Sequence, residues 1–268
     1  MSIRRPAVAG QFYDANPGRL ERSVRSHLEE AAGTPARAMG ALVPHAGYVY
    51  SGPVAGAVYA HLEIPRSVVI LCPNHTGRGA PAALDPSDSW ETPLGAVPLD
   101  RDLADRLLAG APGIEEDASA HRLEHSLEVQ LPFLQVLRPD VRIVPVCLGA
   151  PDLDLCRQVG DAIAAILAAG DPPLLLASSD MNHYESREVG RRKDDLALAR
   201  FLALDAEGLF ATVHARSISM CGFLPATALL FAARGAGAAD ARVVARRDSG
   251  DETGDASSVV GYAGVIVA

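Results

Sequence analysis

The chain has 268 residues, 49% hydrophobic and 21% charged, which suits one large α/β domain or at most two small ones. With 24 basic and 33 acidic residues the net charge is −9, so we expect no binding to nucleic acid or to anionic membranes. The sequence contains no uninterrupted run of about 18 apolar residues, so we expect no membrane-spanning helix. Residues Met1 to Gly10 lack the apolar core of a signal peptide.

Apolar residues at helical spacing alternate along the chain with short apolar runs that are typical of buried strands. The predicted helices cover residues 18–32, 54–62, 100–109, 125–137, 152–168, 190–203, 205–213 and 223–234. The predicted strands cover residues 40–44, 67–72, 141–148, 173–178, 241–246 and 259–267, with two short extended pieces within 81–99. Strands alternating with helices predict a largely parallel central sheet covered by helices.

Polar side chains follow three of the predicted strands. The first strand is followed by His45 and the second by His75, and the apolar run 174–177 leads to Asp180 and His183. In α/β proteins, ligands bind outside the carboxyl ends of the strands. These residues therefore predict one site assembled from distant segments, and the imidazoles indicate a metal or acid/base site.

Each of these side chains also has a structural interpretation. His45 and His75 could be structural histidines in turns, although the small Ala46-Gly47 pair would let a ligand approach the backbone. The nearby Tyr50 could donate a proton or hold a substrate oxygen. Asp180 could orient His183, accept its ring proton, or cap a helix that begins near residue 181.

Four cysteines without a C-x-x-C spacing favour a reducing compartment and a cytoplasmic location. Cys221 stands just before a predicted helix, where a lowered pKa would make its thiol a better nucleophile or metal ligand. The alternative is a small buried apolar residue.

The segment from His121 to His125 reads H-x-x-E-H, the inverted zincin pattern of some zinc proteases. A protease would use His121 and His125 as zinc ligands and Glu124 to activate water. The preceding residues look like a loop, so His121 would lie outside the helix. We therefore expect Glu124, His125 and Glu128 to line or brace the site.

Six short motifs occur along the chain in a characteristic order. They are Ala9-Gly10-Gln11-Phe12-Tyr13, Pro44-His45-Ala46-Gly47-Tyr48, Pro73-Asn74-His75, Glu124-His125-Ser126-Leu127-Glu128, Ser178-Ser179-Asp180 with His183, and Cys221-Gly222. In these motifs the chain resembles the Memo family, whose bacterial and archaeal branch is called AmmeMemoRadiSam system protein B. The resemblance runs from about Arg5 to Tyr262 and implies a single α/β domain, residues 1–268, around a mixed sheet similar to that of class III extradiol dioxygenases.

The resemblance also implies a site. The family's metal ligands correspond to His45, His75 and Cys221, and further pocket residues correspond to Asp180, His183 and Tyr50. Phe12 stands where the animal member has tryptophan. The dioxygenases have a carboxylate where this chain offers a thiolate, which suits copper, zinc or a thiolate-bound iron.

Two functions of different class follow. The first is a redox enzyme, dioxygenase-like, that uses iron(II) or copper on an unknown small molecule, with zinc possible and with His183 as general acid or base. The second is a protein without turnover that binds copper or iron, or docks a peptide. The family name also suggests a functional link to AMMECR-type and radical-SAM proteins.

Overall fold

Four parallel strands form the centre of the main sheet in the computed structural model, which describes residues 2–170 and 172–268. In spatial order they are β2 (Gly40–Val43), β9 (Leu174–Ser178), β3 (Ser67–Pro73) and β8 (Arg142–Leu148). Antiparallel pairings flank them, β12 (Val259–Val267) against β2 and β4 (Ala82–Leu84) against β8. The expected mixed, largely parallel sheet is therefore confirmed. The expected domain, residues 1–268, includes Met1 and Asp171, which lie outside the described residues.

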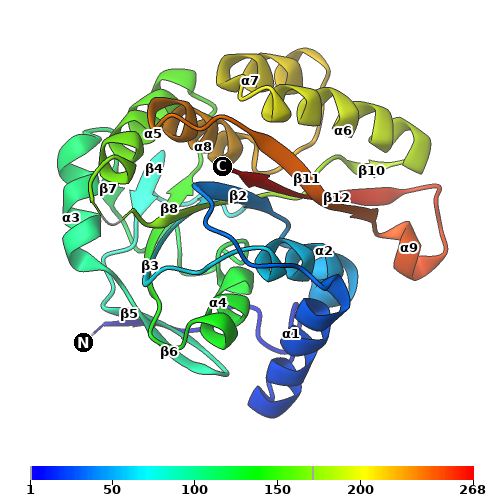
Figure 1. Cartoon of the computed structure of the whole chain (residues 1–268), viewed down its shortest axis with the longest axis horizontal. Coiled ribbons are helices and arrows are strands. Elements are labelled where there is room, and N and C mark those ends of the chain that lie inside the picture. Colours follow the sequence, from blue (N-terminus) through cyan, green and yellow to red (C-terminus); the bar gives the residue numbers. More distant parts are fainter. Residues whose placement is uncertain (1, 171) are drawn as a thin grey trace.

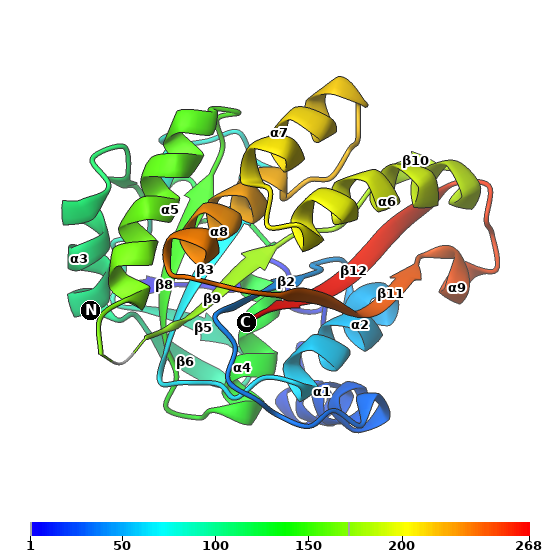
Figure 2. The same cartoon turned by 45° about the horizontal axis from the view of Figure 1, so that its top comes forward.

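Shorter strands complete the β structure. Beyond β12 lie β10 (His183–Glu185) and β11 (Ala241–Asp248), β7 (Glu115–Glu116) pairs with β4, and a second sheet contains β1 (Ile3–Arg4), β5 (Ser89–Thr92) and β6 (Gly95–Pro98). The hairpin of β11 and β12 passes between α6 (Arg187–Leu202) and α2 (Tyr48–Ala60), as Figure 2 shows. Residues 81–99 thus hold three short strands where two extended pieces were expected.

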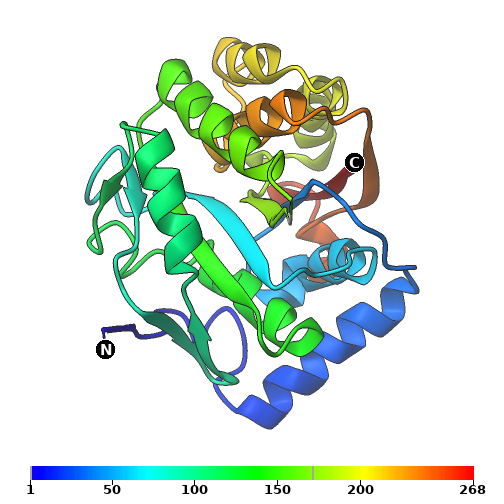
Figure 3. The ribbon, with the colours of Figure 1, turned by 60° about the vertical axis from the view of Figure 1, so that its left-hand side comes forward.

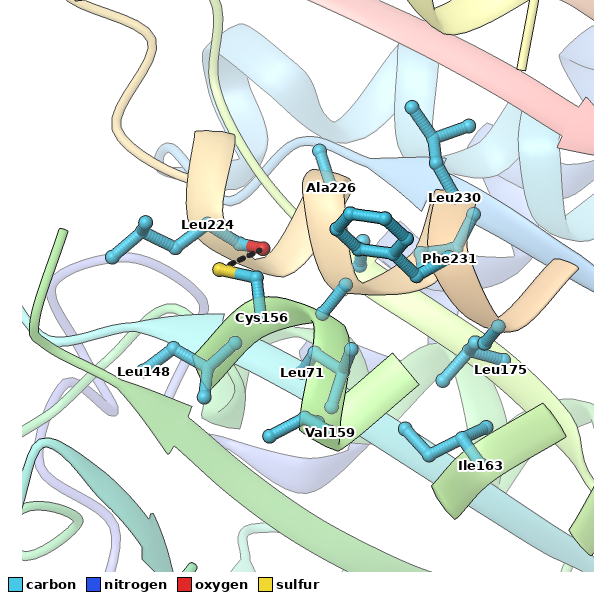
Figure 4. Packing of buried hydrophobic residues seen from close by; sticks show 14 of the residues in the cluster. Leu71, Leu148, Cys156, Val159, Ile163, Leu175, Leu224, Ala226, Leu230 and Phe231 are labelled. Carbon is cyan, nitrogen blue, oxygen red and sulfur yellow. Dashed lines mark hydrogen bonds between the residues drawn. The ribbon is translucent and has the colours of Figure 1, made fainter. Parts of the chain in front are cut away.

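Helices cover both faces of the main sheet (Figure 1 and Figure 3). One face carries α3 (Arg101–Gly110), α5 (Leu153–Leu167), α6, α7 (Ala206–Ala215) and α8 (Phe223–Gly235), and the other carries α1 (Pro17–Ala31), α2 and α4 (Leu131–Leu137). In β3, Val69 and Leu71 face the first layer while Ile70 and Cys72 face the second. This alternation explains why β3 is apolar throughout. Figure 4 shows Leu71 among side chains of α5 and α8.

Two helices begin at residues other than those predicted from the sequence. Helix α2 starts at Tyr48, so Pro53 lies inside it and not near its first position. The expected helix 125–137 is a 3-10 turn, η1 (Glu128–Gln130), followed by α4, where Pro132 suits a helix start. A short helix, α9 (Gly250–Thr253), lies in the loop between β11 and β12. In the described part of the chain, no helix is both long and apolar enough to cross a membrane.

A buried hydroxyl in α8 predicts a stabilising substitution. Thr227 is fully buried, and its Oγ1 has no hydrogen-bond partner among the described residues. Thr227→Val keeps the shape and removes this desolvated group, so we expect the free energy of unfolding to rise by about 1 kcal/mol in urea titrations. The matched change Thr92→Val removes a hydroxyl that donates to Gln135 Oε1 over 2.6 Å, and it should destabilise. A change in the free energy of unfolding that has the same sign in both variants would contradict the prediction.

Candidate metal centre

Three side chains from distant parts of the chain meet at the carboxyl end of the sheet. His45 follows β2, His75 follows β3, and Cys221 precedes α8. One nitrogen of each histidine and the Cys221 sulfur all lie within 4.8 Å of one another. The structure therefore brings together the three residues expected as metal ligands.

His45 is held on both of its ring nitrogens. Its Nε2 lies 3.1 Å from Cys221 Sγ, and its Nδ1 lies 2.9 Å from Ser178 Oγ at the end of β9. Its backbone N–H donates to Asp180 Oδ1 over 2.7 Å. His45 is only 2% exposed, and burial lowers its pKa well below the usual value, so the ring is neutral at neutral pH.

His75 is oriented by a buried carboxylate. Its Nδ1 and its backbone N–H both donate to Glu124, over 2.9 and 2.6 Å. Burial would raise the pKa of Glu124, but hydrogen bonds from His75 and Ser126 lower it to about 2. Burial would likewise lower the pKa of His75, but Glu124 raises it above its usual value. Because Glu124 binds Nδ1, the other nitrogen of His75 remains for a ligand.

The environment of Cys221 favours the protonated form of its thiol. Burial, and then the charge of Asp180, raise its pKa well above the usual value. The expectation that a helix N-terminus lowers this pKa is therefore wrong, because desolvation of the thiolate outweighs the helix dipole. The Sγ accepts the backbone N–H of Asp180 over 3.3 Å.

Asp180 and His183 do not form the expected pair. Burial raises the pKa of Asp180 to about 7, and its carboxyl accepts backbone N–H groups of His45 and Ala46. His183 Nδ1 contacts the carbonyl of Ser219 over 2.9 Å instead. No helix begins near residue 181 for Asp180 to cap, because His183 belongs to β10. The interpretations of Asp180 as a helix cap and as the partner of His183 are thus both wrong.

The metal-centre residues line a cleft of about 770 Å³. Tyr50, Asp180 and His183 all line it, as does His125, whose ring lies 4.7 Å from that of His75. Burial lowers the pKa of His125 to about 4. Sequence reasoning missed further lining residues, for which no local pattern exists: Tyr184, Ser219, Ser249, Thr253, Val260 and Tyr262.

The inverted zincin interpretation is wrong. His121 is fully buried, and its Nε2 lies 3.0 Å from the carbonyl oxygen of Ala83. Residues 118–123 form turns and not a helix, so His121 and His125 do not share a helical face. Within residues 2–170 and 172–268, His121 belongs to no group of possible metal ligands.

Glu128 braces the segment that closes one side of the cleft, as expected. It is fully buried and pairs with Arg4. It also accepts hydrogen bonds from Ala7 N, Val8 N and Tyr13 OH. The anchored segment places the ring of Phe12 4.6 Å from the ring of His125, in the wall of the cleft.

Comparison with known proteins gives consistent results. The sequence model of a family described as Memo-like protein matches residues 4–266. A MEMO1 family protein of Methanosarcina barkeri is 41% identical over 267 residues, covering 99% of this chain and 100% of its own. A MEMO1 family protein of Pyrobaculum arsenaticum is 41% identical over 278 residues, covering 99% of each chain. The crystal structure of an uncharacterized Escherichia coli K12 protein is similar with a TM-score of 0.56 and 15% identity, covering 86% of this chain and 100% of its own.

Proposed function

The chain belongs to the Memo-like protein family, and from that premise we propose that it binds a metal ion through His45, His75 and Cys221 and uses it in redox chemistry on a small molecule. The observation that carries this proposal is the approach of two imidazole nitrogens and one thiol to within 4.8 Å, in the wall of a large cleft. The fold is related to that of the class III extradiol dioxygenases, which are non-haem iron enzymes.

The donor set fits a transition metal. Imidazole nitrogen and thiolate are ligands that iron, copper and zinc accept. Cys221 Sγ and His45 Nε2, the two potential ligand atoms, lie 3.1 Å apart. A cation bound by both would displace the thiol proton. The resulting thiolate and the Glu124 carboxylate together balance a divalent ion, which lowers the cost of burying it. Iron(II) or copper would supply one-electron chemistry when bound, and zinc would supply Lewis acidity.

The protein's own groups would handle protons beside the metal. The Ser219 carbonyl can only accept, so His183 carries its proton on Nδ1 and leaves Nε2 as an acceptor in the cleft. Burial lowers the pKa of His183 below its usual value, which keeps the ring neutral and able to act as a general base. Tyr50 offers a hydroxyl donor in the same cleft.

Metal loading tests the proposal. The metal-free protein is incubated anaerobically with iron(II), freed of excess ion, and assayed for metal content and for oxygen uptake on exposure to air. We expect close to one ion per chain in the wild type and almost none in His45→Ala. Failure of the wild type to retain any metal, or equal retention by His45→Ala, would contradict the proposed site.

The thiolate ligand favours a second candidate, a metal-binding protein without turnover. Thiolates select copper(I) and zinc more than they select oxygen-activating iron. Copper or iron retained without oxygen uptake would support this candidate over the enzyme. Docking of an anionic peptide is less well supported than metal binding. Among the described residues that line the cleft there is neither a lysine nor an arginine to bind an anion.

Glu124 should control metal affinity without touching the metal. Glu124→Gln keeps an acceptor for His75 Nδ1 but removes the charge, so the imidazole becomes a weaker ligand. We expect the metal dissociation constant to rise about 10–100-fold in competition titrations with a chelating dye. Glu116→Gln, which alters an exposed ion pair with Arg101, is the matched control and should leave the constant unchanged. An unchanged constant in Glu124→Gln would refute the role of Glu124.

A further inference from the structure

A buried chain of hydrogen bonds leads from the second helical layer to His45. Tyr59 OH donates to Gln130 Oε1 over 3.0 Å, and Gln130 Nε2 lies 3.0 Å from Ser178 Oγ. Ser178 Oγ lies 2.9 Å from His45 Nδ1 and 2.6 Å from the carbonyl of Ser126. All five residues are at most 2% exposed, so water does not compete for these contacts.

Two backbone carbonyls that contact this hydrogen-bond chain determine where each proton lies. The carbonyl of Pro44 can only accept, so the group of Gln130 that lies 2.9 Å from it is the amide nitrogen. The same nitrogen therefore donates to Ser178 Oγ. The carbonyl of Ser126 can also only accept, so it takes the single proton of the Ser178 hydroxyl.

Ser178 then has only lone pairs left for His45. A hydroxyl donates once and accepts twice, and its one proton already goes to Ser126. The contact with His45 Nδ1 must therefore be a donation from the imidazole to Ser178. The unprotonated nitrogen of His45 is Nε2, which is the atom that faces Cys221 Sγ.

We propose that Ser178, itself oriented by Gln130, is a positioning residue that fixes His45 in the Nδ1–H tautomer and presents Nε2 as a ready metal ligand before any metal arrives. The proposal rests on the proposed metal site for its purpose, but the tautomer is a property of the metal-free protein. It also assigns different supports to the two histidines. A neutral hydroxyl fixes His45, whereas a carboxylate fixes His75 and strengthens it as a donor.

Nitrogen-detected NMR of the full-length metal-free protein tests the tautomer directly. We expect wild-type His45 to carry its proton on Nδ1 alone, and Ser178→Ala to show a mixture of both tautomers in exchange. A wild-type ring protonated on Nε2, or already in exchange between the two tautomers, would overturn the proposal. This measurement does not depend on whether the protein binds metal.

Cobalt(II) titration, followed by the absorption of the cobalt–thiolate bond, tests the consequence. Ser178→Ala should raise the cobalt dissociation constant about 10–100-fold, the usual effect of losing a partner behind a ligand. Ser178→Thr, which keeps the hydroxyl, should restore binding. Thr92→Val is the matched control, because it removes a buried hydroxyl that lies outside this hydrogen-bond chain and donates to Gln135, and it should change the constant less than about threefold.

Equal losses in Ser178→Ala and Thr92→Val would indicate general destabilisation and overturn the positioning role, as would full cobalt affinity in Ser178→Ala. If Ser178→Thr fails to fold, Gln130→Leu takes its place. It removes the amide that orients Ser178 but keeps the Ser178 hydroxyl, so its spectrum should show a share of the Nδ1–H tautomer between those of the wild type and Ser178→Ala. A share identical to that of the wild type would overturn the orienting role of Gln130. A wild type that shows the expected tautomer but binds no cobalt would refute the metal function alone.

Discussion

Cys221→Ser is expected to lower metal affinity at least about a hundredfold. Metal sites with four protein ligands gain about 10–16 kcal/mol on binding, so one thiolate accounts for about 3 kcal/mol. The serine hydroxyl does not ionise near neutral pH and is a poor ligand for soft metals. Metal content after dialysis against a chelator, together with competition titrations, measures the loss.

Cys156→Ser is the control for this result. Cys156 is a buried cysteine, whereas Cys221 is only partly buried. Cys156 lies in the core between α5 and α8, where its Sγ contacts the carbonyl of Leu224 (Figure 4). The substitution Cys156→Ser should leave metal affinity unchanged. Comparable losses in both variants would mean that the thiol of Cys221 acts through stability and not as a ligand.

Glu128→Ala is expected to destabilise the protein by about 3–5 kcal/mol. It removes one partner of a buried ion pair and leaves the guanidinium of Arg4 desolvated without its counter-charge. It also leaves the backbone N–H groups of Ala7 and Val8 without their acceptor. Urea unfolding of the metal-free chain measures the change in the free energy of unfolding.

Glu188→Ala is the control for burial. Glu188 pairs with Arg192 one helical turn away, but its side chain is 81% exposed, so its loss should cost less than about 1 kcal/mol. A small effect of Glu128→Ala, similar to that of Glu188→Ala, would contradict the bracing role. A large effect should also loosen the segment that holds Phe12, which hydrogen exchange of residues 5–13 would detect.

Local patterns predicted the fold well where the signal was local. The apolar run of β3 reflects burial on both faces of the sheet, and the apolar spacing of α5 reflects burial along one side of the helix. Both elements were therefore predicted close to their observed bounds. Pro53 misled the prediction of α2, because proline is usually tolerated only in the first turn of a helix, whereas here it lies inside a helix that begins at Tyr48. The strand β10 was missed because its three residues are too few for a periodic pattern.

The candidate site likewise contains some residues that local sequence patterns predicted and some features that they did not. His45 and His75 were identifiable because each follows an apolar strand. Cys221 was a candidate from its place before a helix, and the family resemblance implied that it is the third ligand. The loop-like residues before His125 correctly placed His121 outside a helix. The separation of Asp180 from His183 could not be predicted from a short motif, because it depends on the contact of His183 with the carbonyl of Ser219 in a distant segment.

The amino-acid sequence indicates which chemical groups stand at the ends of the strands, because strand ends and residue types are local properties. The properties of those groups depend on the tertiary structure. It placed Glu124 behind His75 and Ser178 behind His45, and it partly buried Cys221 so that desolvation raises the pKa of its thiol. Burial and hydrogen-bond partners come from segments up to 176 residues apart, as in the contact of Cys221 with His45, and no local pattern encodes them.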